Sequence, residues 1–362
     1  MPANDRLLAL GLMSGTSCDG VDAALIETDG HSDIIRGRWL TQSYDAAFQS
    51  RLHSVLGARG PIAEVERELT ERHAVAVRQL LADAGLSADR VDVVGFHGQT
   101  ILHEPEQGRT WQIGDGAALA QQCGIDVVND FRSRDVAEGG QGAPLVPLFH
   151  AALAGAVQKP VAVVNIGGVA NVTWIGANGD DDILAFDTGP GNAMINDWAL
   201  RHTGRPVDEG GALARAGRVN TTALDVLLAD PYFDKPAPKS LDRDAFASNA
   251  LGGLSAADGA ATLVAFTVAA IARAQEHFPQ PVQRWLIAGG GRHNPAIMAA
   301  LTDRLGPTVA SVETAGWEGD ALEAQAFGYL AVRSLRGLPL SLPQTTGVRR
   351  PMPGGRLHRA AR

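Results

Sequence analysis

An apolar run broken by a turn of small polar residues, close to the N-terminus, constrains the fold of this chain more than any other feature. Residues 8–13 are apolar, residues 14–20 read SGTSCDG, and residues 21–26 are again mostly apolar. Two β-rich runs around such a turn predict a β-hairpin. The turn combines hydroxyls with backbone amides that its glycines leave accessible, and such a nest of donors binds phosphate. A tight hairpin closed by a local hydrogen bond from Asp19 would have the same composition, so this stretch alone leaves both interpretations open.

Length and composition limit the class of protein. The chain has 362 residues, more than one hydrophobic core usually organises, and two domains are expected. A formal net charge of −9 argues against a nucleic-acid partner, because binding to a phosphate backbone needs a basic surface. The two cysteines, Cys18 and Cys123, form neither a disulfide framework nor a metal-site spacing. No signal peptide and no membrane-spanning segment are recognised, which predicts a cytoplasmic protein.

Strands and helices alternate along the chain, and this alternation predicts an α/β protein. The apolar run at residues 161–166, its glycine turn and the return strand at residues 172–175 echo the first hairpin about one domain length later. Further strands are expected over residues 33–41, 91–96, 125–128, 183–186, 285–288 and 309–312, and helices over residues 61–84, 117–122, 193–202, 258–277, 294–305 and 320–335. A surface excursion is expected over residues 231–255, and a partly ordered tail beyond about residue 339.

The glycine-rich loop at residues 139–144 marks a candidate domain boundary. We expect a first domain formed by residues 1–135 together with about residues 336–362, and a second domain formed by residues 136–335.

The common nucleotide and hydrolase motifs are missing from the sequence. The chain contains no Gly-Lys dipeptide, and no G-x-G-x-x-G follows a strand. HExxH, CxxC and GxSxG are missing as well. A bound nucleotide would therefore place its phosphates against the hairpin turns.

Seven sequence blocks in a fixed order carry a resemblance to a known family. From Gly11 to Gly291 the chain contains GLMSGTSCDGVD, HGQT, QIGDGAALA, DFRSRDVAEGGQGAPLVP, NIGGVANVT, FDTGPGN and GGG. The two hairpins, the later triple-glycine turn and an aspartate at a strand end resemble the actin, hexokinase and Hsp70 superfamily, in which two related domains clamp ATP. Within that superfamily, the blocks are most similar to the anhydro-N-acetylmuramic acid kinase family.

This resemblance implies a fold of two actin-like (RNase H-like) α/β domains with an ATP cleft between them. It implies an enzyme that uses ATP, Mg²⁺ and water to open 1,6-anhydro-N-acetylmuramic acid and to phosphorylate it, giving N-acetylmuramic acid 6-phosphate in cell-wall recycling. A homodimer is consistent with the family. Two alternatives stay open: another sugar kinase of the same fold, and a nucleotide-switched binding protein.

Asp187, in the block FDTGPGN, matches the family's catalytic base, which would take a proton from the attacking water. The alternative is a turn residue whose carboxylate bonds the N–H groups of residues 188–192.

The resemblance assigns ATP contacts to three glycine turns. They are Gly15, Thr16, Ser17, Cys18, Asp19, Gly20, Val21 and Asp22 in the first hairpin, Gly167, Gly168 and Asn171 in the second, and Gly289, Gly290 and Gly291 further on. Turn geometry alone is the alternative for each glycine group. Met13 stands where the wider superfamily carries an aspartate near the metal, so the Mg²⁺ ligands are undetermined, and Asp19, Asp22 and Asp187 are candidates through water.

The sugar contacts implied by the resemblance are His97, Gly98, Gln99, Thr100, Gln112, Asp130, Arg134 and Glu323. Arg134 is expected to pair with the lactyl carboxylate, because a guanidinium meets a carboxylate in a bidentate fork. Alternatives stay open here too: an ion pair of Arg132 or Arg134 with Asp130 or Asp135, a structural role for His97, satisfaction of a strand-end amide by Thr100 or Gln112, and a solvated helix face for Glu323.

Overall fold

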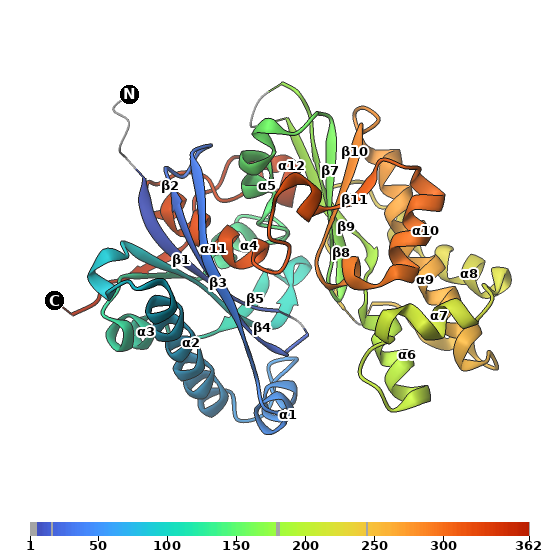
Figure 1. Cartoon of the computed structure of the whole chain (residues 1–362), viewed down its shortest axis with the longest axis horizontal. Coiled ribbons are helices and arrows are strands. Elements are labelled where there is room, and N and C mark those ends of the chain that lie inside the picture. Colours follow the sequence, from blue (N-terminus) through green and yellow to red (C-terminus); the bar gives the residue numbers. More distant parts are fainter. Residues whose placement is uncertain (1–5, 16, 179–181, 244, 362) are drawn as a thin grey trace. The chain divides into compact units, whose positions relative to one another are not determined.

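The computed structural model describes residues 6–15, 17–178, 182–243 and 245–361, which form two compact units (Figure 1). The first unit contains residues 1–156 and 321–362, and the second contains residues 157–320. Each unit is built around one β-sheet with helices packed on it.

The sheet of the first unit begins with the expected hairpin. Strands β1 (Leu7–Ser14), β2 (Gly20–Thr28) and β3 (Ile34–Ser43) are antiparallel neighbours, whereas β4 (Val93–Glu104) runs parallel to β1 and β6 (Val127–Asn129) parallel to β4. Strand β5 (Arg109–Ile113) pairs with the far end of β4, and β12 (Arg356–His358) pairs with β6. The helices of this unit are α1 (Ala46–Ser54), α2 (Ile62–Ala84), α3 (Gly116–Cys123), α4 (Ser133–Ala137), α5 (Pro147–Leu153), α11 (Leu322–Leu335) and α12 (Pro343–Thr346).

Successive residues of a strand point to opposite faces of this sheet, and helices cover both faces. Leu10 and Leu12 of β1 belong to the core that α2 completes with Leu69 and Val77. The residue between them, Gly11, points the other way: a Cβ there would lie 1.7 Å from a backbone oxygen of α11. Helix α11 therefore packs directly on the backbone of the sheet.

This packing corrects the expected domain boundaries at residues 135 and 335. Helix α11 lies on β1, β2 and β4, so it belongs to the first unit, and α5 is in the same unit. The chain crosses between the units after Ala156 and after Asp320. The glycine-rich loop at residues 139–144 is therefore inside the first unit rather than at a boundary.

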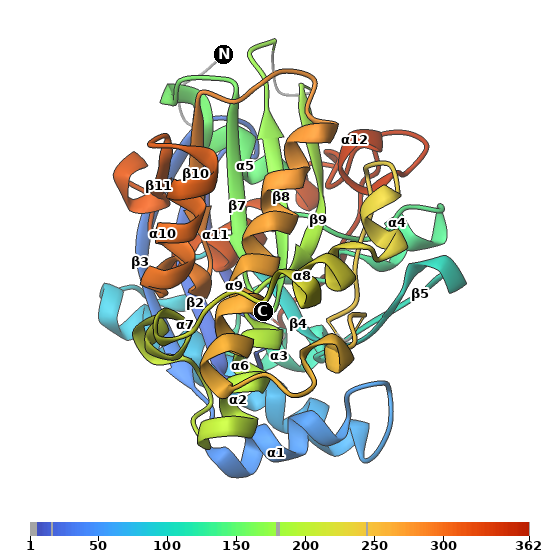
Figure 2. The same ribbon diagram turned by 90° about the vertical axis from the view of Figure 1, so that its right-hand side faces the viewer.

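The sheet of the second unit repeats the same plan. Strands β7 (Val161–Ile166), β8 (Val169–Ile175) and β9 (Ile183–Pro190) are antiparallel neighbours, β10 (Arg284–Ala288) is parallel to β7, and β11 (Val309–Ser311) is parallel to β10. The helices are α6 (Ala193–Thr203), α7 (Ala212–Ala216), α8 (Thr221–Leu228), α9 (Ala256–Arg273) and α10 (Pro295–Leu305). Figure 2 shows α9 running along the face of this sheet, on β8 and β9.

Both sheets thus share a five-strand arrangement, in the order β3-β2-β1-β4-β6 in the first unit and β9-β8-β7-β10-β11 in the second. In each, the first three strands of the unit are antiparallel neighbours and the other two run parallel to the first, whereas β5 and β12 are antiparallel additions to the first sheet. This repeated topology is the actin-like arrangement that the resemblance implies. The prediction of an α/β protein made of two such units is confirmed.

Two further expectations are corrected. Residues 231–255 do not simply run over the surface, because Tyr232, Phe233 and Leu251 are buried in the core of the second unit. Residues 340–361 are an integral part of the first unit, where they form α12 and β12. In the described part of the chain one helical segment, residues 256–277, is long and apolar enough to cross a membrane, but 67% of its apolar window is buried in the unit, as in a core helix.

Candidate active site

The turn of the first hairpin is held by a hydrogen-bonded frame. Cys18 is buried with φ = 55°, and its N–H donates to the carbonyl of Gly15 at 3.1 Å. The hydroxyl of Ser17 donates to the carboxylate of Asp19 at 2.7 Å, and both residues are exposed. The side chain of Val21 is fully buried, so only its backbone can face a ligand. Thr16 lies outside the described residues.

The side chain of Gln99 on β4 supports this turn through hydrogen bonds. Its amide oxygen accepts from the hydroxyl of Ser14 at 2.7 Å, and its amide nitrogen donates to the carbonyl of Gly15 at 3.1 Å. The hydroxyls of Ser14 and Tyr44 lie 2.9 Å apart, and burial raises the pKa of Tyr44, so its phenol stays protonated. A residue assigned to the sugar is therefore bonded to the turn assigned to ATP.

Thr100 and Gln112 face each other across the β4–β5 pair. They are partners in the register, and the amide of Gln112 donates to the hydroxyls of Thr100 at 3.3 Å and Thr110 at 2.8 Å. Gly98 precedes them with φ = +73°, and a Cβ there would lie 2.3 Å from the carbonyl oxygen of Ile113. The glycine lets β5 approach, which places the two polar side chains together.

His97 is buried and linked to Arg132. The Nε of Arg132 donates to Nε2 of His97 at 3.1 Å, and its Nη1 donates to the carbonyl of Gly142 at 2.7 Å. Because a guanidinium has no acceptor, Nε2 of His97 carries no proton, and Nδ1 donates to the carbonyl of Gly98 at 2.8 Å. Burial, together with the charge of Arg132, holds the pKa of His97 well below its usual value. Both ring nitrogens are engaged, which fits a residue that orients Arg132.

Asp130 and Arg134, two residues before and two residues after Arg132 in the sequence, are both exposed. Asp130 follows β6 with φ = 54°, and Arg134 belongs to the short helix α4. In the described part of the chain, the carboxylate of Asp135 accepts hydrogen bonds from Gly142, Ser341 and Thr346. The salt bridges among the described residues do not include Arg134. Glu323 is half-buried in the first turn of α11.

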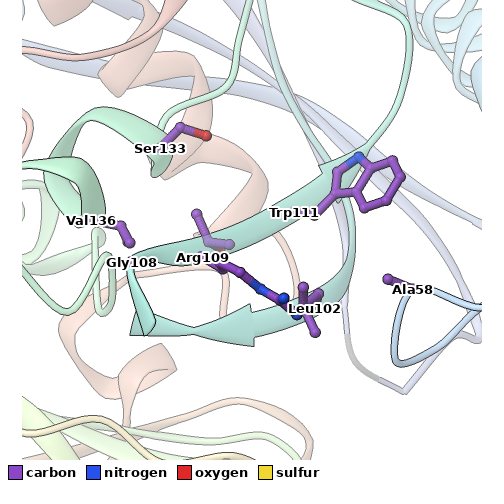
Figure 3. A pocket seen from close by; sticks show the side chains of 8 residues that line it. Ala58, Leu102, Gly108, Arg109, Trp111, Ser133 and Val136 are labelled. Atoms are coloured by element: carbon purple, nitrogen blue, oxygen red, sulfur yellow. The ribbon is translucent and has the colours of Figure 1, made fainter. Parts of the chain in front are cut away.

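A pocket of about 500 Å³ lies in the first unit, beside the β4–β5 hairpin and helix α4 (Figure 3). Its lining residues are Ala58, Leu102, Gly108, Arg109, Thr110, Trp111, Ser133 and Val136. Ser133 and Val136 flank Arg134 and Asp135 in the sequence, so the pocket shares α4 with the expected sugar-binding arginine. No residue assigned to the sugar lines it in the described part of the chain.

The glycine turns of the second unit meet at the carboxyl ends of the neighbouring parallel strands β7 and β10. Gly167 and Gly168 join β7 to β8, and their carbonyls accept from the N–H groups of Asn192 at 2.7 Å and Gly191 at 2.9 Å. The turn after β10 joins them, because Gly289 has φ = +73° and a Cβ there would lie 2.7 Å from the carbonyl oxygen of Ile166. The two segments of this unit that are assigned to ATP are therefore brought together, with Gly290 exposed.

Asp187 lies on β9 directly opposite Asn171 on β8. The carboxylate is buried, and its Oδ2 accepts from the N–H of Leu241, 54 residues further along the chain, at 2.8 Å. The N–H of Asp187 donates to the carbonyl of Lys239 at 2.9 Å, and its carbonyl accepts from the hydroxyl of Tyr232 at 2.5 Å. The fold therefore places the carboxylate of Asp187 beside Asn171, which is assigned to ATP. The segment that holds this carboxylate lies within residues 231–255, which were expected to be a surface excursion.

Lys239, Tyr232 and Leu241 are the residues around Asp187 that the sequence analysis missed. The Nζ of Lys239 donates to the carbonyl of Tyr232 at 3.2 Å and lies 4.7 Å from the centre of its ring. Burial lowers the pKa of Lys239 to about 8. The signal available in the sequence was the apolar content of this segment, with Tyr232, Phe233 and Leu241, which is unusual for a solvated loop.

Among the described residues, no group of three or more His, Cys, Asp or Glu side chains is arranged to hold a metal ion. Asp22 accepts from the hydroxyl of Thr41 at 2.5 Å, and Asp19 is exposed at the turn. This donor set fits Mg²⁺ bound mainly by phosphates and water, because that ion usually takes only one or two carboxylates from the protein.

Comparisons with known proteins match nearly the whole chain. The family model described as Anhydro-N-acetylmuramic acid kinase matches residues 7–359. A protein of that name from Paramagnetospirillum magneticum is 58% identical over 97% of this chain and 99% of the relative. Another from Rhodospirillum rubrum is 56% identical over 96% of this chain and 93% of the relative. Among solved structures, component A of the Acidaminococcus fermentans (R)-2-hydroxyglutaryl-CoA dehydratase aligns with 13% identity and a TM-score of 0.47, covering 90% of this chain and 99% of the other.

Proposed function

The chain belongs to the anhydro-N-acetylmuramic acid kinase family, and on this premise we propose that it opens and phosphorylates 1,6-anhydro-N-acetylmuramic acid at the expense of ATP. The products are N-acetylmuramic acid 6-phosphate and ADP, so the enzyme serves the recycling of cell-wall sugars. The observation that carries this assignment is the match of residues 7–359 to the family, with relatives at 56% and 58% identity.

The reaction joins a hydrolysis to a phosphoryl transfer. Water attacks C1 of the sugar and loses a proton to a base, the bond between C1 and O6 breaks, and O6 takes the γ-phosphoryl group as ADP leaves. None of these steps forms a covalent bond to the protein. The enzyme therefore acts by positioning the reactants and by stabilising charge.

We assign the role of the base to Asp187. Its hydrogen bond from Leu241 orients the carboxylate, and its position opposite Asn171 puts it beside the glycine turns of the second unit. Those turns, with Gly290 exposed, and the turn at residues 15–22 would contact the ATP phosphates through backbone amides. Asp19, Asp22 or Asp187 would hold Mg²⁺ through water, and the ion would offset the charge of the phosphates.

The sugar would be bound by the first unit. Thr100 and Gln112 offer adjacent polar groups, and the exposed guanidinium of Arg134 is the cation for the lactyl carboxylate. His97 would act through Arg132, and Gln99 through the ATP turn. Asp130 and Glu323 complete the proposed set. We further propose a cytoplasmic homodimer on family grounds, which light scattering of the purified protein would test.

Incubation of the protein with ATP, Mg²⁺ and the anhydro sugar in ¹⁸O-labelled water tests the reaction. Mass spectrometry should find one labelled oxygen, at C1, in a product that also carries phosphate. Phosphate transfer to another amino sugar, with no conversion of the anhydro sugar, would instead identify a different kinase of this fold.

The Asp187→Asn substitution tests the base, because it keeps the size of the side chain and an oxygen for the Leu241 N–H. We expect kcat to fall by about 10²- to 10⁴-fold, the usual contribution of a general base. Asp197→Asn removes a carboxylate from the exposed Arg243 ion pair and should leave kcat unchanged. Full activity in Asp187→Asn would show that another group accepts the proton.

A further inference from the structure

A buried carboxylate in the first unit receives two hydrogen bonds from hydroxyls of the C-terminal segment. Asp135 is 2% exposed, and its carboxylate accepts from the N–H of Gly142 at 2.7 Å, the hydroxyl of Thr346 at 2.7 Å and the hydroxyl of Ser341. The two hydroxyls come from residues 206 and 211 positions further along the chain. A buried carboxylate needs such donors, since an unpaired charge in the interior is costly.

The same contacts fold the glycine-rich loop around this carboxylate. The N–H of Gly140 donates to the backbone carbonyl of Asp135 at 2.9 Å, and the N–H of Gln141 donates to the carbonyl of Thr346 at 2.6 Å. A Cβ on Gly140 would lie 2.1 Å from a carboxylate oxygen of Asp135. The loop at residues 139–142 is therefore closed on one side by Asp135 and on the other by α12.

From this loop the contacts lead to the proposed sugar site. Gly142 donates its N–H to Asp135 and accepts at its carbonyl from Arg132, and Arg132 donates to His97. Asp135 is also the next residue after Arg134. Helix α4 has only five residues, and so short a helix is not stable by itself. The orientation of the Arg134 side chain depends on the contacts that fix α4 in place. Asp135 is the buried residue of that helix whose hydrogen bonds fix it.

We propose that Asp135 is a positioning residue for the sugar, and that the C-terminal segment at residues 340–347 is part of the sugar-binding apparatus because it supplies the donors that hold this carboxylate. This inference rests on the proposed function of the first unit. It predicts that loss of one hydroxyl in the C-terminal segment weakens binding of the anhydro sugar without changing the use of ATP.

Two substitutions at one position test the proposal. Thr346→Val keeps the shape of the side chain and removes the hydroxyl, whereas Thr346→Ser keeps the hydroxyl. In Thr346→Val we expect KM for the anhydro sugar to rise about tenfold, with kcat and KM for ATP changed less than about threefold. Thr346→Ser should restore the wild-type KM. Arg359→Ala, which loosens an exposed ion pair at the other end of the C-terminal segment, should change neither constant.

Hydrogen exchange on the ligand-free proteins gives a readout that does not depend on the reaction. Amides in residues 138–146 should exchange faster in Thr346→Val than in wild type or Thr346→Ser. Faster exchange with an unchanged KM for the sugar would overturn the positioning role, and unchanged exchange would overturn the link itself. A wild-type protein that does not convert the anhydro sugar would refute the proposed function, whatever the exchange experiment shows.

Discussion

At the scale of single residues, the contacts of Gln99 indicate a different role from the sugar contact that the resemblance implies. Its side chain bonds Ser14 and Gly15, on the turn assigned to ATP. We therefore expect Gln99→Leu to raise KM for ATP about tenfold, because the turn loses its support, and to change KM for the sugar less. Gln112→Leu removes the same amide from β5 and should affect the sugar instead. Steady-state kinetics with each substrate varied in turn would decide, and a rise confined to the sugar KM in Gln99→Leu would restore the direct contact.

Buried histidines make stability depend on pH. Burial lowers the pKa of His73 to about 4 and that of His150 to about 3. Below about pH 6.5 the unfolded chain binds protons at these residues while the folded chain does not, so the free energy of unfolding falls as the pH drops toward 4. Each histidine should cost about 2 kcal/mol between about pH 6.5 and pH 5.

Denaturant unfolding at several pH values measures this effect. The variant His73→Phe, which keeps an aromatic ring next to Phe96, should show a smaller loss of stability on acidification than wild type. Equal pH dependence in the two proteins would mean that His73 is not the source.

At the scale of elements, the contact of α11 with the sheet depends on glycine. A Cβ on Gly95 of β4 would lie 2.0 Å from the carbonyl oxygen of Phe327, and backbone atoms of a packed helix cannot move aside cheaply. Gly95→Ala should lower the free energy of unfolding by about 3 kcal/mol or more. Gly155→Ala is the matched control, since a Cβ there meets nothing within 4 Å. Thermal unfolding of both variants compares them, and similar Tm values would contradict the close packing.

At the scale of the whole molecule, the two units differ in how the chain builds them. The second unit is one continuous segment, residues 157–320, with its own core, and we expect that fragment to unfold cooperatively on its own. The first unit takes α11 and β12 from residues after 320, so residues 1–156 alone would leave one face of the sheet uncovered. We expect this fragment to be unfolded or aggregated. Circular dichroism of the two fragments tests this difference, and a cooperative transition in residues 1–156 would contradict it.

The local patterns of the sequence were sufficient to predict the α/β class, most of the strands and the long helices. Apolar runs broken by glycine turns predicted both hairpins, and the strand and helix at residues 285–305 were found because periodicity and capping act over a few residues. The ordered blocks also identified the family. These signals are local, or lie in a fixed order along the chain, and a single sequence displays them directly.

Only the tertiary structure decided which distant segments meet. It placed α11 in the first unit, brought residues 239–241 to Asp187, and joined the C-terminal segment to Asp135. Nothing in the local sequence distinguishes the residues that make these contacts: Lys239 follows a proline, and Ser341 and Thr346 lie near the end of the chain. Their importance comes from partners that are tens to hundreds of residues away, and such pairings are selected by the packing of the whole core, which no local pattern encodes.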